Sequence, residues 1–180
     1  MFYVFLANGF EEAEALVPVD LLRRAGVQVA TVGVTGREVN GAHGICVRAD
    51  LLPEEYAPEG CEGILLPGGM PGTKNLAASD SVRNAVQRCV DAGALLCAIC
   101  AAPSVPGEMG LLKGKKAVCY PGFESKLLGA QVSSDVSVRD GNVITARGAG
   151  CVFSFSHKII AALRGVETAD RVIKEIICTL

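Results

Sequence analysis

Short apolar runs alternate with longer amphipathic stretches along the 180 residues of the chain. Most of the short runs are continuous, which is typical of parallel strands that are buried on both faces. We predict strands at 2–6, 27–34, 63–66, 94–99, 117–120 and 143–146. We predict helices at 11–25, 79–92, 152–164 and 168–178, and one more after Cys100. Strands and helices that alternate over short connections indicate an α/β sandwich around a mainly parallel sheet.

One segment, 36–58, fits neither pattern, and we expect it to form a hairpin and loop at one edge of the sheet. No repeat, low-complexity tract or linker divides the chain. Because one domain usually takes roughly 100–200 residues, we expect residues 1–180 to form a single domain.

Charged residues are few and of mixed sign. Lys and Arg number 17 against 19 Asp and Glu, the net charge is −2, and no block of like charge occurs. Aromatic residues make up 5% of the chain and Trp is absent, which leaves little for stacking on bases. We therefore expect neither a nucleic-acid partner nor a membrane partner.

Eight cysteines could in principle form a disulfide framework. Most of them lie inside apolar runs, and the apolar start at 1–6 has no basic leader and is too short for a signal sequence. We therefore expect reduced thiols and a cytoplasmic location.

Unusual residues follow three of the predicted strands, at 8–14, at 67–72 and at Cys100. In open α/β sheets the functional groups gather beyond the carboxyl ends of the strands. We therefore expect these three places to meet.

Cys100 ends an apolar strand and precedes a helical stretch, with Ala98 and Ala102 as small neighbours. Small neighbours permit the tight strand-to-helix turn on which hydrolases place a nucleophile. The unpaired N–H groups of a helix start favour a thiolate, so we expect a lowered pKa for Cys100. The alternative is a buried apolar cysteine, which is our interpretation of most of the other seven.

Glu14 shares one face of the first predicted helix with Val17, Pro18 and Leu21. A carboxylate on an apolar stripe needs a partner or a raised pKa. The alternative is that the acidic residues only favour the positive end of the helix, and Glu12 also fits an apolar stripe.

The Pro67-Gly68-Gly69 segment is either a sharp turn or a set of backbone N–H groups open to an oxyanion. Neither a dinucleotide-binding fingerprint nor a P-loop is present, because no Gly-x-Gly-x-x-Gly follows the first strand and no Gly-Lys-Ser/Thr occurs.

Cys97 and Cys100 have the spacing of a dithiol pair or half a zinc site. Their odd separation along a strand sends the side chains to opposite faces, and no second pair completes a zinc site. Of the two histidines, we expect His157 to be structural and His43 to be solvated, so no imidazole neighbours Cys100 in sequence.

Four segments together, 5–15, 66–69, 98–103 and 145–150, resemble the signature segments of the ThiJ/PfpI superfamily, in particular its parkinsonism-associated deglycase branch and bacterial relatives. The resemblance covers essentially the whole chain. It implies a flavodoxin-like three-layer sandwich of the class I glutamine amidotransferase type, usually assembled as a homodimer.

The resemblance also implies roles for individual residues. The reactive cysteine of the family falls on Cys100, its protonated partner glutamate on Glu14, and its oxyanion-binding backbone on Gly68, Gly69 and Ala101. A protonated Glu14 is physically reasonable, because an ionised carboxylate beside the sulfur opposes thiolate formation.

Two residues depart from the family pattern. Tyr120, a possible pocket-lining residue, stands where many relatives have a histidine, and a phenol is a poor general base near neutral pH. Pro106 falls just inside the helix after Cys100 and should shorten or bend it.

The resemblance implies an enzyme without cofactor or metal that acts on small reactive carbonyls, turning glyoxals or their adducts into hydroxy-acids, as a glyoxalase III-like or deglycase-like hydro-lyase or hydrolase. Cys100 is then the nucleophile and Glu14 moves the proton. The alternative is a redox-sensing or stress-protective protein whose Cys100 oxidises. A cysteine peptidase or amidotransferase-like hydrolase is disfavoured, because Ala101 supplies no imidazole beside the thiol.

Overall fold

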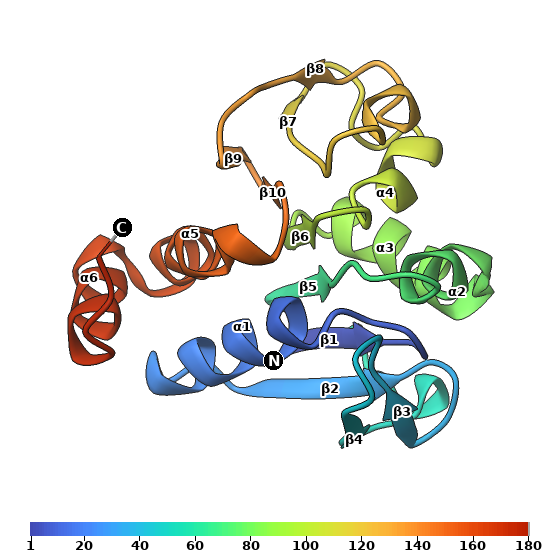
Figure 1. The fold of residues 1–180 in the computed structure, drawn as a ribbon, viewed down its shortest axis with the longest axis horizontal. Helices are drawn as coiled ribbons and strands as arrows, with labels where there is room; N and C mark the ends of the chain where they lie inside the picture. The colour runs from blue at the N-terminus through green and yellow to red at the C-terminus, as the bar shows by residue number, and fades with distance from the viewer. Residues whose placement is uncertain (180) are drawn as a thin grey trace.

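A six-stranded sheet forms the centre of the computed structural model, which describes residues 1–179. Its strands run in the order β2-β1-β5-β6-β10-β9 (Figure 1). Their bounds are β1 Phe2–Leu6, β2 Val29–Gly33, β5 Gly63–Leu66, β6 Leu95–Ile99, β9 Ser137–Asp140 and β10 Val143–Ala146. All neighbours pair in parallel except β9, which pairs antiparallel with β10. The predicted mainly parallel sheet is confirmed.

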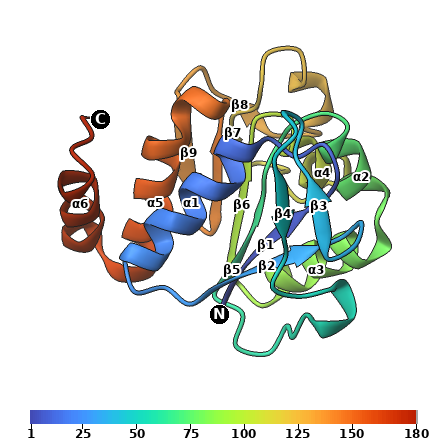
Figure 2. The same ribbon diagram turned by 60° about the horizontal axis from the view of Figure 1, so that its bottom comes forward.

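Two layers of helices cover the sheet, one on each face (Figure 2). Phe2, Val4 and Leu6 of β1 pack into the core under α1, α5 and α6. Tyr3 and Phe5 pack into the second core, under α2, α3 and α4. The helices are α1 Glu12–Arg24, α2 Gly72–Ala78, α3 Asp80–Asp91, α4 Ser104–Glu108, α5 Val152–Arg164 and α6 Val166–Glu175. The architecture is the predicted flavodoxin-like three-layer sandwich.

The strand predictions at 2–6, 63–66 and 143–146 match β1, β5 and β10, and those at 27–34 and 94–99 contain β2 and β6. The strand predicted at 117–120 is wrong. Only β7, Lys116–Ala117, is a strand there, and it pairs with β8, Gln131–Val132, outside the main sheet. The edge strand β9 was not predicted, because its Ser-Val-Arg-Asp sequence has no apolar run.

The segment 36–58 contains the expected hairpin, formed by β3, Glu38–Asn40, and β4, Cys46–Arg48. The helix predicted at 168–178 is displaced: α6 spans Val166–Glu175 and so begins and ends earlier than predicted. Helix α4 spans five residues and includes Pro106, as expected of a shortened helix. Short 3-10 turns lie at Pro53–Glu55, Glu124–Lys126 and Ala149–Cys151.

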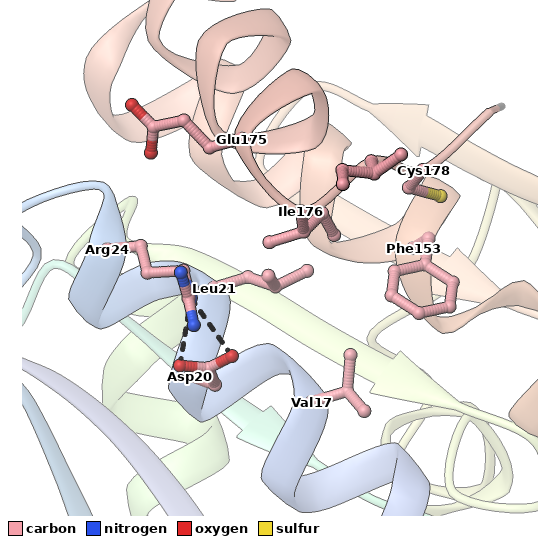
Figure 3. A pocket seen from close by; sticks show the side chains of 9 residues that line it. Val17, Asp20, Leu21, Arg24, Phe153, Glu175, Ile176 and Cys178 are labelled. Atoms are coloured by element: carbon pink, nitrogen blue, oxygen red, sulfur yellow. Dashed lines mark hydrogen bonds and ion pairs between the residues drawn. The ribbon is translucent and has the colours of Figure 1, made fainter.

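A hollow of about 720 Å³ lies on the surface where α1, α5 and the end of α6 come together (Figure 3). Its apolar part is formed by Val17, Leu21, Phe153, Ile176 and Ile177. At its rim, Arg24 Nε donates to both carboxylate oxygens of Asp20 over 3.1 Å. Within residues 1–179, none of the helices has the length and apolar character to cross a membrane.

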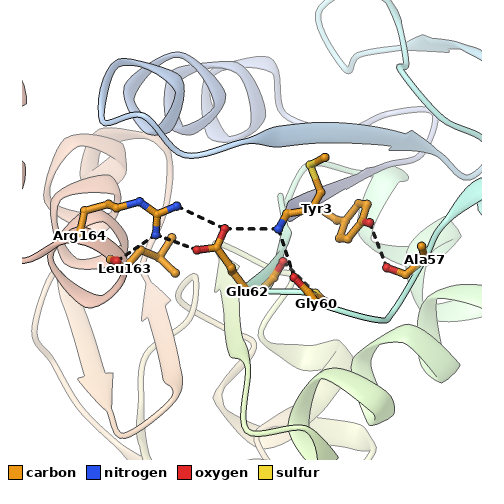
Figure 4. A network of polar contacts seen from close by, with 9 residues as sticks. Tyr3, Ala57, Gly60, Glu62, Leu163 and Arg164 are labelled. Atoms are coloured by element: carbon orange, nitrogen blue, oxygen red, sulfur yellow. Dashed lines mark hydrogen bonds and ion pairs between the residues drawn. The ribbon is translucent and has the colours of Figure 1, made fainter.

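A polar network joins the start of the sheet to the end of α5 (Figure 4). Arg164 Nη1 lies 2.7 Å from Glu62 Oε1, and the amino group of Met1 lies 3.3 Å from Glu62 Oε2. The Tyr3 hydroxyl donates to the Ala57 carbonyl over 2.9 Å. These contacts lie at the amino ends of the strands, so they tie the sandwich together at the edge opposite to Cys100.

Candidate active site

Segments that follow β1 and β5 interlock at the carboxyl edge of the sheet. Glu11 N–H donates to the Gly68 carbonyl over 3.0 Å, and Gly72 N–H donates to the Gly9 carbonyl over 3.1 Å. The fit is close enough that a Cβ on Gly69 would lie 2.4 Å from the Glu11 nitrogen. The predicted meeting of the segments after β1 and β5 is therefore confirmed.

Cys100 lies directly after β6 on a strained turn. Its φ of 63° is in the left-handed region, which a non-glycine residue adopts only where the surrounding structure holds it. Cys100 N–H donates to the Ala146 carbonyl over 2.9 Å, and its own carbonyl accepts from Tyr120 N–H over 2.8 Å. The tight turn predicted from the sequence is present, and Cys100 is partly exposed there.

Glu14 is 1% exposed and is aimed at Cys100 from the first turns of α1. Its Oε2 accepts from Gly68 N–H over 2.8 Å, and its side chain hydrogen-bonds to the Cys100 thiol. Burial raises the pKa of Glu14 to about 7, against the smaller lowering effects of the bonds to Cys100 and Gly68. The interpretation that Glu14 only favours the helix start is therefore wrong.

Two opposing sets of effects act on the pKa of the Cys100 thiol. Burial and then the charge of an ionised Glu14 raise the pKa to about 12, while the N–H groups of Ala101 and Gly69, which hydrogen-bond to the sulfur, lower it by less. The predicted lowering of this pKa is therefore wrong, because burial of the thiol alone is the largest effect and raises it. A thiolate requires that Glu14 hold the proton, so the two groups titrate as a coupled pair.

The donors around the sulfur differ in part from the predicted set. Gly69 and Ala101 direct their N–H groups at the sulfur, whereas Gly68 gives its N–H to Glu14. Helix α4 begins only at Ser104, so the donors come from the two turns and not from a helix start. A Cβ on Gly68 would lie 2.6 Å from both Cys100 Cβ and Glu14 Oε2, so glycine is required between these two side chains.

Glu12 is buried as well, in a role that the sequence did not predict. Its Oε1 accepts from His43 N–H over 2.7 Å, and its Oε2 lies 3.0 Å from His43 Nδ1. Burial opposes its charge, but the bonds from His43 and Ile45 outweigh this effect and lower the pKa of Glu12. Glu12 therefore anchors the β3–β4 hairpin beside the site, and the spacing of 31 residues between the partners hides this from local sequence patterns.

Both histidines are engaged away from the thiol. The His43 ring is exposed as predicted but pairs with Glu12, and His157 Nε2 lies 2.7 Å from Asp170 Oδ1. Tyr120 is 50% exposed, and its ring lies against Gly148. Within residues 1–179 the hydrogen-bond partners of Cys100 thus include no imidazole.

The fold and this geometry define a class: flavodoxin-like sandwiches with a cysteine on a strained turn, beside a buried carboxyl group and two backbone N–H donors. The chain matches the DJ-1/PfpI family model over residues 2–162, and it belongs to this family. The predicted ThiJ/PfpI resemblance is confirmed.

Several relatives are similar over most of their length. Protein dj-1beta of Drosophila melanogaster is 34% identical, with 95% of this chain and 93% of the relative covered. A glutathione-independent glyoxalase of Caenorhabditis elegans is 31% identical, with 91% and 88% covered. A deglycase of Pyrococcus abyssi is 25% identical, with 89% and 98% covered.

Solved structures agree with the fold. A DJ-1 superfamily protein from Salmonella typhimurium is 36% identical, with a TM-score of 0.94 and coverage of 99% of this chain and 98% of that chain. Oxidised DJ-1 of Toxoplasma gondii is 31% identical, with a TM-score of 0.95 and the same coverage. The family therefore includes proteins named as glyoxalases, as deglycases and as DJ-1 proteins.

Proposed function

We propose that the protein is a cysteine-dependent enzyme that converts glyoxals, or their early adducts, into hydroxy-acids without a cofactor. The observation that carries the proposal is that the buried Glu14 carboxyl group and the Cys100 sulfur meet at Gly68, where an added Cβ would lie 2.6 Å from Glu14 Oε2 and 3.1 Å from Cys100 Sγ. The names of the glyoxalase and deglycase relatives support the substrate class.

The reaction needs one nucleophile and one proton carrier. With its proton passed to Glu14, the Cys100 sulfur adds to the aldehyde carbon and forms a hemithioacetal oxyanion near the N–H groups of Gly69 and Ala101. Glu14 protonates this oxygen and then, as a carboxylate, moves a proton from the former aldehyde carbon to the neighbouring carbon, while the proton of the new hydroxyl group passes to the ketone oxygen. The first carbon is oxidised to a thioester and the second is reduced to an alcohol. Water then hydrolyses the thioester to the hydroxy-acid and the free thiol.

The test is turnover of methylglyoxal by a Cys100→Ala variant. We expect at least ~1000-fold loss of kcat/KM, because the covalent step is removed. Cys61→Ala is the matched control, because Cys61 is a free thiol that precedes β5 at the amino ends of the strands, opposite to Cys100, and should be dispensable. Activity of Cys100→Ala near that of the wild type would refute the proposal.

A second candidate function uses the same sulfur as a redox sensor. A partly exposed thiol that receives two backbone N–H bonds can also stabilise a sulfinate, and one relative is described in an oxidised form. Intact-mass and peptide analysis after mild peroxide treatment should then place the added oxygen mainly on Cys100. Oxidation spread evenly over the eight cysteines would count against this function.

We also propose a two-fold homodimer, and we place the activity in the cytoplasm, where free thiols persist. The surface of α1 and α5 in Figure 3 is a suitable contact, since it exposes 37% of Phe153 next to Val17. Light scattering coupled to gel filtration should report a dimer for the wild type and a monomer for Phe153→Glu. A monomeric wild type would exclude the assembly.

A further inference from the structure

Two carboxylates and one imidazole gather beside the candidate active site, where the tip of the β3–β4 hairpin lies against the start of α1. His43 Nδ1 lies 3.0 Å from Glu12 Oε2 and 3.5 Å from Glu11 Oε2. The backbone also holds the hairpin tip there, since Ala42 N–H donates to the Phe10 carbonyl over 2.8 Å. The proposed mechanism gives Glu11 and His43 no task.

Glu11 is linked to the buried Glu14 as well. Glu11 N–H donates to the Gly68 carbonyl, and Gly68 N–H donates to Glu14 Oε2 over 2.8 Å, so both acidic residues hold the same glycine. Glu11 directly precedes α1 and Glu14 is its third residue, and side chains at these two positions are neighbours at a helix start. Burial has the largest effect on the pKa of Glu14, and the charge of Glu11 raises this pKa further.

The charged groups on the surrounding elements have other partners. Cys100 and Glu11 are the titratable groups with the largest effects on Glu14, and Glu12 and Glu11 are those that act on His43. The remaining groups pair as follows: Arg164 of α5 with Glu62, His157 of α5 with Asp170, Arg24 of α1 with Asp20, Arg23 of α1 with Asp50, and Arg37 before β3 with Glu55. In the hairpin, Glu38 lies opposite Arg48, while the charges of Lys158 and Arg147 act on Asp135 and Cys119.

We propose that Glu11 and His43 form an electrostatic control of Glu14, in which the Glu11 carboxylate favours a proton on Glu14 and the protonated His43 ring opposes it. Both are positioning residues, because they act on the reaction through Glu14. The bond with Glu12 and the charge of Glu11 raise the pKa of His43 above 6.5, and Glu14 has a pKa of about 7. His43 therefore loses its charge in the range where Glu14 titrates, and the charge of Glu11 then acts on Glu14 unopposed.

The consequence for catalysis rests on the proposed function, in which the reactive state has its proton on Glu14 and its negative charge on Cys100. Neighbouring side chains of a helix lie about 5–6 Å apart, and two unit charges at this distance in water change an equilibrium about 3-fold. Loss of the Glu11 charge should therefore make the reactive state ~3-fold less populated. Loss of the His43 charge should make it more populated.

The test follows the carboxyl carbon of Glu14 by 13C NMR in protein labelled with 13C-glutamate. The loss of one signal in Glu14→Gln identifies it. We expect the midpoint of its titration to fall by ~0.5 pH units in Glu11→Gln and to rise in His43→Gln. Glu167→Gln is the matched control, because it removes the same charge from an exposed position at the start of α6 and should keep the wild-type midpoint.

Salt separates the charge effect from a loosened hairpin. In 1 M salt the difference between Glu11→Gln and the wild type should disappear, because salt screens charges near the surface. A difference that persists in 1 M salt would show that the substitution changes the structure, and it would refute the electrostatic control. A midpoint that is unchanged in Glu11→Gln, or that does not rise in His43→Gln, would refute it as well.

The titration uses no substrate, so it separates this inference from the proposed function. Shifted midpoints in a protein that does not turn over methylglyoxal would uphold the electrostatic control and refute the proposed reaction. If both hold, kcat/KM for methylglyoxal should fall ~3-fold in Glu11→Gln and stay unchanged in Glu167→Gln. A shifted midpoint with unchanged kcat/KM in Glu11→Gln would refute the catalytic consequence.

Discussion

The raised pKa of Glu14 makes the stability of the protein depend on pH in a defined direction. Burial moves this pKa from 4.5 to about 7, so the folded protein keeps a proton that the unfolded chain loses over this range. The contribution of Glu14 is therefore complete below pH 4.5 and is lost as the pH rises through about 7. A rise of this size corresponds to about 3 kcal/mol of free energy of unfolding.

Glu14→Gln removes this titration, so comparing the variant with the wild type should reveal how much free energy of unfolding depends on it. Urea unfolding of the wild type and the variant is measured at closely spaced pH values from 4.5 to above 7. We expect the stability of Glu14→Gln relative to the wild type to increase by about 3 kcal/mol across this range. The ultraviolet absorbance of the thiolate, followed over the same range, reports whether the charge of the pair lies on sulfur or on oxygen.

Glu12→Gln is the control, because its carboxyl group is buried on the same helix but has a lowered pKa. Its relative stability should stay nearly constant over the lower part of this range, because the lowered pKa of Glu12 places its own titration below pH 4.5, and the His43 that pairs with Glu12 has a pKa raised above 6.5. A difference between Glu14→Gln and the wild type that does not vary with pH would refute the reasoning.

Three further predictions concern the same site. In Glu14→Gln, alkylation of Cys100 by iodoacetamide should set in at lower pH than in the wild type, because the charge that raises the thiol pKa is gone, and an unchanged or higher midpoint would contradict this. Gly68→Ala should lose at least ~10-fold in kcat/KM and about 1–3 kcal/mol in stability from overpacking, as turnover and urea unfolding would show; Gly150→Ala, with open space around it, should lose neither. Cys100→Gly should have a free energy of unfolding about 1 kcal/mol higher than Cys100→Ala, because glycine adopts the positive φ without strain. Equal midpoints of urea unfolding would argue against a strained turn.

The main sheet could be predicted because parallel strands buried on both faces are continuous apolar runs. Helix α2 was missed because it begins at Gly72 and continues with polar residues. The run at 117–120 is apolar and buried in part, yet it is no strand of the main sheet. Val118 N–H donates to Thr145 Oγ1, and Tyr120 N–H donates to the Cys100 carbonyl. The backbone of this run therefore supports the turn at Cys100 and does not pair as a strand of the main sheet.

The candidate site could be located from sequence, but its electrostatics could not. Cys100 and Glu14 were identified, and the three-dimensional neighbours then decided the rest. Gly68 gives its N–H to Glu14, and the ionised carboxyl group raises the thiol pKa that a helix start was expected to lower. These effects depend on which groups are aimed at one another across more than fifty residues of chain, a relation that no local spacing records.

The turn at Cys100 is anchored in a way that leaves the type of side chain at position 120 open. The bond from Tyr120 to Cys100 and the bond from Cys100 to Ala146 involve main-chain atoms alone. Any residue with a backbone N–H can therefore hold the turn at position 120, and its side chain is left free to change. A substitution at position 120 would therefore alter what faces an incoming molecule without loosening the scaffold, so directed evolution could explore new chemistry there at little risk to folding.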